Sequence, residues 1–260
     1  MEIRIESDLS RPEVQRPVVA RGMAYAAGTI VPAHSHARAQ LLYGATGAVM
    51  AETPSGAWMM PPDHALWIPA GMVHQVRMMG AVQVQSLYFA PCAVTAMPSS
   101  CVVLGITALM RSLLAEAVTL PAEYDLGGRD GLVMTLIQTE LLRLPEMPLS
   151  LPLPREPRLA ARCRDFLANP TPHDTIDDWA HQSGLSRRTF TRKFRAETGL
   201  SFIEWRQRAC VMAALPRLAA GEAVTSVALD LGYSNPAAFS AMFARTLGAA
   251  PRAYLASAGV

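Results

Sequence analysis

Hydrophobic runs of strand length occupy the first third of the chain, with glycine or proline between most of them. They cover residues 28–31, 40–43, 47–51, 65–68, 74–77 and 82–88. Short runs bounded by turn-forming residues are typical of a small β-sandwich or barrel. We therefore expect one over residues 17–89, filled mainly by aromatic and methionine side chains.

The hydrophobic pattern changes to a helical period after residue 88. It predicts two amphipathic helices, over residues 103–120 and 130–144. Their apolar or small positions are Leu104, Thr107, Ala108, Met110, Leu113, Leu114 and Val118, then Leu132, Val133, Leu136, Ile137, Leu141 and Leu142. Such helices can pack on the barrel, on each other or on a second copy of the chain. A homodimer formed through them is therefore one hypothesis.

Proline marks the next change along the chain. Residues 145–157 hold five prolines in thirteen positions, so this segment should be extended and semi-rigid. We take it as a linker between two parts of the chain. The expected domains are a barrel over 1–100, a helical dimerisation region over 101–144, the linker, and a C-terminal domain over 158–260.

The C-terminal part begins with a helix, a tight turn and a second helix over residues 176–197. Gly184 supplies the backbone freedom of the turn, and Ser186 can cap the second helix. Phe190 and Phe194 are four residues apart, so they lie on one helix face and can anchor it. The other face carries Arg188, Thr191, Arg192 and Arg195.

This pattern occurs a second time, over residues 225–246. Ala180, Gly184, Phe190, Phe194 and Gly199 correspond to Ala228, Gly232, Phe239, Phe243 and Gly248. Asn235 can cap the second helix of this copy, with Pro236 at its first position. A long helix over residues 201–218, bent or ended near Pro216, joins the copies. The sequence thus predicts two helix-turn-helix units in an all-α domain.

Charge is divided unevenly along the chain. Residues 1–154 carry 9 Arg and 12 Asp or Glu, whereas residues 155–260 carry 14 Arg or Lys and 9 Asp or Glu. The net charges are therefore −3 and +5. A basic C-terminal part favours a polyanionic partner such as double-stranded DNA. A solvated basic helix would show the same arginine stripe, so the stripe alone does not decide between the two interpretations.

The four cysteines and the N-terminal residues bear on the compartment. Cys92, Cys101, Cys163 and Cys210 have no CxxC spacing, which favours reduced and mostly buried thiols. The first residues are too charged for a signal peptide, and no apolar run has the length of a membrane span. We expect a cytoplasmic protein that does not enter a membrane.

Three histidines form a candidate ligand set in the predicted barrel. His34 and His36 are two residues apart, so on a strand they point to the same side. The turn at Pro69 and Gly71 could bring His74 opposite them. With the amide oxygen of Gln40, the imidazoles make a plausible site for one divalent transition metal. Alternatively, these residues line an effector pocket or bond to one another. His64 follows a turn and is expected to be exposed.

These segments resemble the two motifs of the cupin superfamily of jelly-roll barrels. The matching features are the glycines at 28 and 47, the two histidines after Gly28 and the turn before His74. The resemblance implies a metal held by His34, His36, residue 40 and His74. Gln40 stands where the metal-binding pattern has Glu. Asp63 stands where the second motif begins with Gly, and Met78 where it usually ends in Asn.

The repeated units resemble the DNA-binding domain of the AraC/XylS family of bacterial transcription regulators. The matching segments include Ala180 to Ser186, Phe190 to Gly199, Ala228 to Ser234, Phe239 to Phe243 and Pro251 to Tyr254. A cupin barrel in front of this domain is the common arrangement in that family. The expected fold is therefore a multi-domain α and β chain, with a cupin barrel, flanking helices and an all-α domain.

The family resemblance implies that each unit places its second helix in the major groove. Base contacts then fall to Arg188, Thr191 and Arg192, and phosphate contacts to Arg187, Lys193 and Arg195. In the second unit few outward residues can hydrogen-bond a base, so Ser234, Asn235 and Arg245 should contact the backbone. Ser240 is the remaining polar candidate there.

The leading interpretation is a transcription regulator, an activator or a repressor, whose barrel senses a small molecule or a metal and which controls neighbouring genes. It would be no enzyme, would act as a homodimer and could contact RNA polymerase. One alternative is a metal-dependent cupin enzyme, although no acid or base stands near the histidines in sequence. A second alternative is an architectural DNA-binding protein whose barrel takes no effector.

Overall fold

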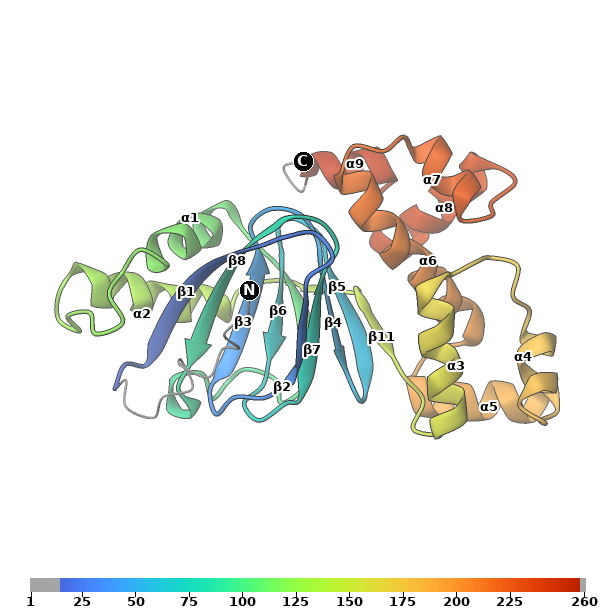
Figure 1. Cartoon of the computed structure of the whole chain (residues 1–260), viewed down its shortest axis with the longest axis horizontal. Coiled ribbons are helices and arrows are strands. Elements are labelled where there is room, and N and C mark those ends of the chain that lie inside the picture. The colour runs from blue at the N-terminus through green and yellow to red at the C-terminus, as the bar shows by residue number, and fades with distance from the viewer. Residues whose placement is uncertain (1–14, 258–260) are drawn as a thin grey trace. The chain divides into compact units, whose positions relative to one another are not determined.

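A computed structural model describes residues 15–257 of the chain (Figure 1). Contacts between residues divide it into two compact units. One unit runs to Thr53 and resumes over Met60–Met147, and the other combines Pro54–Met59 with the chain from Pro148 onward. Among the described residues, no helix is both long and apolar enough to cross a membrane.

From residue 15 onward, the β-rich part is made of two sheets. Their strands are β1 (Val18–Tyr25), β2 (Ile30–His34), β3 (Ala39–Gly44), β4 (Val49–Thr53), β5 (Gly56–Met60), β6 (His64–Ile68), β7 (His74–Met78), β8 (Val82–Phe89), β9 (Val102–Gly105), β10 (Glu146–Met147) and β11 (Ser150–Pro152). The strand orders are β1-β8-β3-β6-β9-β10 and β11-β5-β4-β7-β2. All six predicted runs are strands, whereas β1 and β5 were not predicted.

The sequence placed the first helix too early. Residues 102–105 form strand β9, which pairs antiparallel with β6, and Ile106 N donates to Asp63 O at 2.8 Å. Thr107 then caps helix α1 (Ala108–Ala117) through its hydroxyl. The β-branched Val102 and Val103 favour a strand, and the helical spacing of Leu104 and Thr107 was coincidental. The linker is extended as expected, but it also contains strands β10 and β11.

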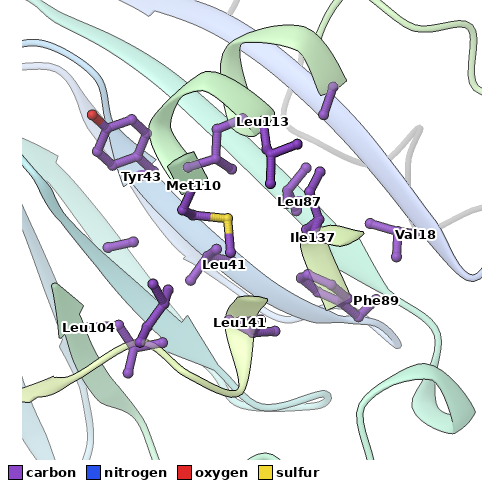
Figure 2. Packing of buried hydrophobic residues seen from close by; sticks show 14 of the residues in the cluster. Val18, Leu41, Tyr43, Leu87, Phe89, Leu104, Met110, Leu113, Ile137 and Leu141 are labelled. Carbon is purple, nitrogen blue, oxygen red and sulfur yellow. The ribbon is translucent and has the colours of Figure 1, made fainter. Parts of the chain in front are cut away.

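Helices α1 and α2 (Arg129–Leu141) cover one face of the larger sheet. Figure 2 shows Met110 and Leu113 of α1 and Ile137 of α2 in one buried cluster with Leu87 and Phe89 of β8. Leu41 and Tyr43 of β3 belong to the same cluster, because alternate residues of a strand share a face. Several leucines of the helical region are instead exposed, namely Leu109, Leu126, Leu132, Leu136 and Leu142.

Seven helices make up the C-terminal part as far as the structure describes it, to residue 257. They are α3 (Pro157–Ala168), α4 (Ile176–Gln182), α5 (Arg187–Thr198), α6 (Phe202–Ala219), α7 (Val224–Asp230), α8 (Pro236–Leu247) and α9 (Pro251–Ser257). Trp179, Phe202 and Trp205 form a buried aromatic cluster around which the first helices pack. Pro216 lies inside α6, in its last turn, where it does not end the helix.

Candidate nucleic-acid interface and metal centre

The first helix-turn-helix unit consists of α4 and α5. The Thr175 hydroxyl accepts from Asp178 N and caps α4, and Ser186 accepts from Thr189 N and caps α5. Between the helices, Gly184 has a φ of 65°, which a residue with a side chain adopts only at a cost. Phe190 and Phe194 are fully buried, so they fix which face of α5 turns outward.

The outward face of α5 is cationic. A shallow, open hollow on it is lined by Arg187, Arg188, Thr191, Arg192, Arg195 and Ala196. All of these residues are exposed. Arg187 is paired with Asp177 at 3.1 Å, but both side chains are more than 60% exposed. The pair therefore adds little to the stability of the fold, and Arg187 can exchange Asp177 for a phosphate. Lys193, predicted to contact phosphate, is half-buried and does not line the hollow.

The second unit, α7 and α8, has a different outward face. A hollow of about 290 Å³ lies there, lined by Val224, Thr225, Pro236, Ala237, Ser240, Ala250, Pro251 and Arg252. Asn235 Oδ1 accepts from Ala237 N at 2.8 Å, so its side chain caps α8. Ser234 and Arg245 are exposed outside the hollow. Arg252 was not predicted, since it lies beyond the repeated pattern, at the start of α9.

The three predicted histidines lie together. His34 is opposite His74 in the pairing of β2 with β7. Their ring centroids are 4.4 Å apart, and His36 lies 5.1 Å from His74 and 6.0 Å from His34. One ring nitrogen from each falls within 4.8 Å of the others, which is close enough for a shared ion. The cluster gathers donors that the sequence places up to 40 residues apart.

Backbone carbonyls orient these rings. The Nδ1 atoms of His34, His36 and His74 lie 2.5–2.9 Å from the carbonyl oxygens of Pro32, Arg38 and Met72. A carbonyl can only accept, so each Nδ1 carries the proton and each neutral ring keeps its lone pair on Nε2. Carbonyls that orient histidines in this way are characteristic of metal sites in proteins.

Gln40 completes the cluster from β3. Its Nε2 donates to Ser86 Oγ at 2.9 Å and to Tyr88 Oη at 3.3 Å, which turns Oε1 toward His36 Nε2 at 3.0 Å. Gln40 Oε1 and His36 Nε2 both offer lone pairs, so a cation bound by both atoms would satisfy both. Gln40 is buried and neutral. The donor set of three imidazoles and one amide oxygen therefore fits a divalent transition metal.

His64 and Asp63 correct one expectation and explain a departure from the cupin motif. His64 is buried, not exposed, and burial lowers the pKa of its imidazole. Its strand β6 lies in the middle of the larger sheet, which encloses it. Asp63 has a φ of 61°, so an aspartate occupies a left-handed position that Gly would fill easily. It also pairs with Arg111 of α1 at 2.5 Å.

Comparisons with known proteins match both parts of the chain. Residues 179–257 match a family described as a helix-turn-helix domain, and residues 16–125 match an AraC-like ligand binding domain. The chain is 33% identical over 228 residues to the HTH-type transcriptional regulator NimR of Escherichia coli K12, covering 86% of this chain and 82% of NimR.

Two further proteins align with part or most of the chain. The HTH-type transcriptional regulator RipA of Corynebacterium glutamicum is 32% identical over 141 residues, covering 54% of this chain and 41% of RipA. A structure of ToxT from Vibrio cholerae aligns with 92% of this chain and 98% of its own, with 9% identity and a TM-score of 0.38.

Proposed function

The chain belongs to the AraC family of transcription regulators and is a DNA-binding regulator with an effector-sensing domain, and we propose here which residues carry each task. The observation that carries most is the exposed cationic face of α5 over two buried phenylalanines.

We assign sequence recognition to α5. Arg188, Thr191 and Arg192 are spaced to contact base edges in the major groove, where a guanidinium can bond guanine O6 and N7 together. Arg187, Lys193 and Arg195 flank them and would bind phosphates, which fix the register of the protein on the duplex.

In the second unit, phosphate and sugar contacts predominate. Ser234, Asn235 and Arg245 are exposed around the start and end of α8, and Ser240 and Arg252 line its hollow. The cap role of Asn235 leaves its Nδ2 free to donate to a phosphate. The alanines of α8 offer only methyl groups, which can contact the methyl group of thymine.

We propose that His34, His36, Gln40 and His74 form the sensing site and hold one divalent transition metal. When bound, that ion would supply a Lewis-acidic position for an effector. The residues would hold the site rigid, since main-chain carbonyls orient all three imidazoles. The role is sensing and not catalysis. The three-histidine cluster also fits a metal-dependent enzyme, which is the second candidate function.

The assembly we propose is a homodimer through the exposed leucines of the helical region. Leu132 and Leu136 of α2 are 68% and 40% exposed and lie on one side of that helix. Such apolar surface favours burial against a second copy. Sedimentation of the full chain as a monomer at high micromolar concentration would contradict the dimer.

We further propose that the regulator acts on a neighbouring gene in the cytoplasm, with RNA polymerase as a further contact.

A binding-site selection with the full chain tests the central assignment. We expect a defined operator, and we expect Arg192→Ala to remove the preference at one or two positions. Metal analysis of His34→Ala and His74→Ala tests the sensing site: both variants should lose the metal and change operator affinity. Unchanged DNA binding together with lost turnover of some substrate would favour the enzyme instead.

A further inference from the structure

Part of the proline-rich segment over residues 145–157 is an ordered strand, β11, at one edge of the five-stranded sheet. β11 pairs antiparallel with β5, and the ladder is extended by Met59 N to Leu149 O at 3.1 Å and Leu153 N to Ser55 O at 2.9 Å. Leu149, Leu151 and Leu153 are buried and alternate with half-buried residues. This period of two is that of a strand with one buried face.

Two side chains of the helical domain also form hydrogen bonds with this segment. Trp205 of α6 donates from Nε1 to Pro152 O at 2.8 Å. Glu197 of α5 accepts from Arg155 N at 2.8 Å and Glu156 N at 3.2 Å on the same oxygen. Both side chains bond main-chain atoms, so these contacts depend on the path of the segment and not on its side chains.

The position of Glu197 needs a reason. A carboxylate on a helix that faces DNA repels phosphates, so it weakens binding unless it has another task. Two amide donors on one carboxylate oxygen are charge-assisted hydrogen bonds, which are stronger than neutral ones. The task that fits is to join α5 to the chain that precedes α3.

We propose that residues 149–156 act as a strap, and that Glu197 and Trp205 are positioning residues which couple the first helix-turn-helix unit to strand β5. β11 is one edge strand of the five-stranded sheet, and β2 and β7 of that sheet carry His34 and His74. A shift of this sheet at the histidines is therefore transmitted along the strap to α5. This regulatory part rests on the proposed function, whereas the strap itself does not.

A distance measurement on the full chain tests the strap. Spin labels are placed at Pro54→Cys, beside β5, and at His181→Cys, on α4, in a Cys92→Ala background that removes the exposed cysteine. We expect one narrow distance distribution, and a distribution about twofold broader in Glu197→Ala, because the α5 contact is lost. Trp205→Phe, which keeps a ring but lacks the donor, should broaden it as well.

Two matched variants control for charge and for helix capping. Glu197→Gln removes the same charge as Glu197→Ala but keeps an acceptor, so its distribution should stay close to the wild-type width. Glu204→Ala removes the carboxylate that caps α6 without contacting the segment, and it should leave the width unchanged. A broad wild-type distribution would overturn the strap. So would a Glu197→Ala distribution as narrow as that of Glu204→Ala.

A double-mutant cycle tests transmission from the histidines. His74→Ala should change operator affinity about fivefold or more in the otherwise wild-type chain, and less than about twofold in the Glu197→Ala background. Equal effects in both backgrounds, or no effect in either, would overturn transmission. Absence of any sequence preference in the wild-type chain would instead contradict the proposed function, and the distance measurement, which needs no DNA, would still decide the strap.

Discussion

The two helix-turn-helix units are built from helices of equal length. α4 and α7 each have seven residues, and α5 and α8 each have twelve. Each long helix ends at a glycine in the left-handed conformation, Gly199 at a φ of 75° and Gly248 at 83°. Each is anchored by two phenylalanines, Phe190 and Phe194 in α5 and Phe239 and Phe243 in α8, and all four are fully buried. The scaffold has therefore been kept in both copies.

The outward faces of the same two helices differ. Arg192 of α5 corresponds to Ala241 of α8, and Arg195 corresponds to Ala244. The difference follows from the helical period, which assigns the buried and the outward positions to separate residues. One copy can therefore lose its hydrogen-bonding groups without losing its fold. We infer that the copies share a structural role in holding DNA and differ in how much sequence they discriminate.

The largest expected effect tests the shared scaffold. Phe190→Ala and Phe239→Ala should each lower the free energy of unfolding by about 3–5 kcal/mol, because each leaves a cavity beneath the long helix. Chemical denaturation followed by circular dichroism measures both, with the exposed Arg195→Ala as a control near zero. A much smaller loss for Phe239→Ala would mean that the second unit is not an equivalent scaffold.

The next effect tests the difference in discrimination. Arg192→Ala should weaken operator binding by about 1–3 kcal/mol and relax the preference at one position, since a bidentate contact to guanine is lost. Ser240→Ala in the second unit should change affinity far less. Fluorescence anisotropy with the operator and with single-base variants measures both. Equal losses would contradict the assignment of base contacts to α5.

Much of this comparison was accessible from the sequence, because the repeat and the phenylalanine spacing follow from a helical period. The strands with turn signals on both sides were also predicted. β5 was missed because all five of its residues are buried, so it shows no alternation of polar and apolar positions. β11 was missed because Pro152 and the prolines on either side of the strand suggested a linker, although proline is tolerated on an edge strand.

The sites were predictable only as far as local spacing reaches. A strand and a turn predicted that His34, His36 and His74 would lie near one another, and the structure brings the three together, although His36 lies beyond the end of β2 and not on the strand. The contacts of Glu197 with Arg155 and Glu156 span more than 40 residues and bond main-chain atoms, so no sequence pattern announces them. The burial of His64 likewise depends on pairing between distant strands.

A smaller effect separates backbone from base contacts. Arg195→Ala in the first unit and Arg245→Ala in the second should each weaken binding to all duplexes alike, and each should lower the slope of log affinity against log salt by about one. Affinity measured across a salt series checks this. A change in sequence preference with either variant would show that the residue contacts a base.

The smallest expected effect concerns the starts of the short helices. Thr175 caps α4 through its hydroxyl, whereas Ala223 at the start of α7 makes no side-chain cap. Ala223→Ser should therefore raise the free energy of unfolding by about 0.5–1 kcal/mol, and Thr175→Ala should lower it by about 1 kcal/mol. No gain from Ala223→Ser in denaturation would indicate that α7 starts elsewhere.

Binding-site selection with the full chain, repeated with Arg192→Ala and with Ala241→Arg, tests the asymmetry between the units most directly. Arg192→Ala identifies the segment of the operator under α5, because its preference disappears there. We predict that this segment carries most of the selected sequence, and that Ala241→Arg adds a preference only in the neighbouring segment. The predicted asymmetry would be contradicted if both operator segments carried equal sequence information, or if both substitutions changed the specificity equally.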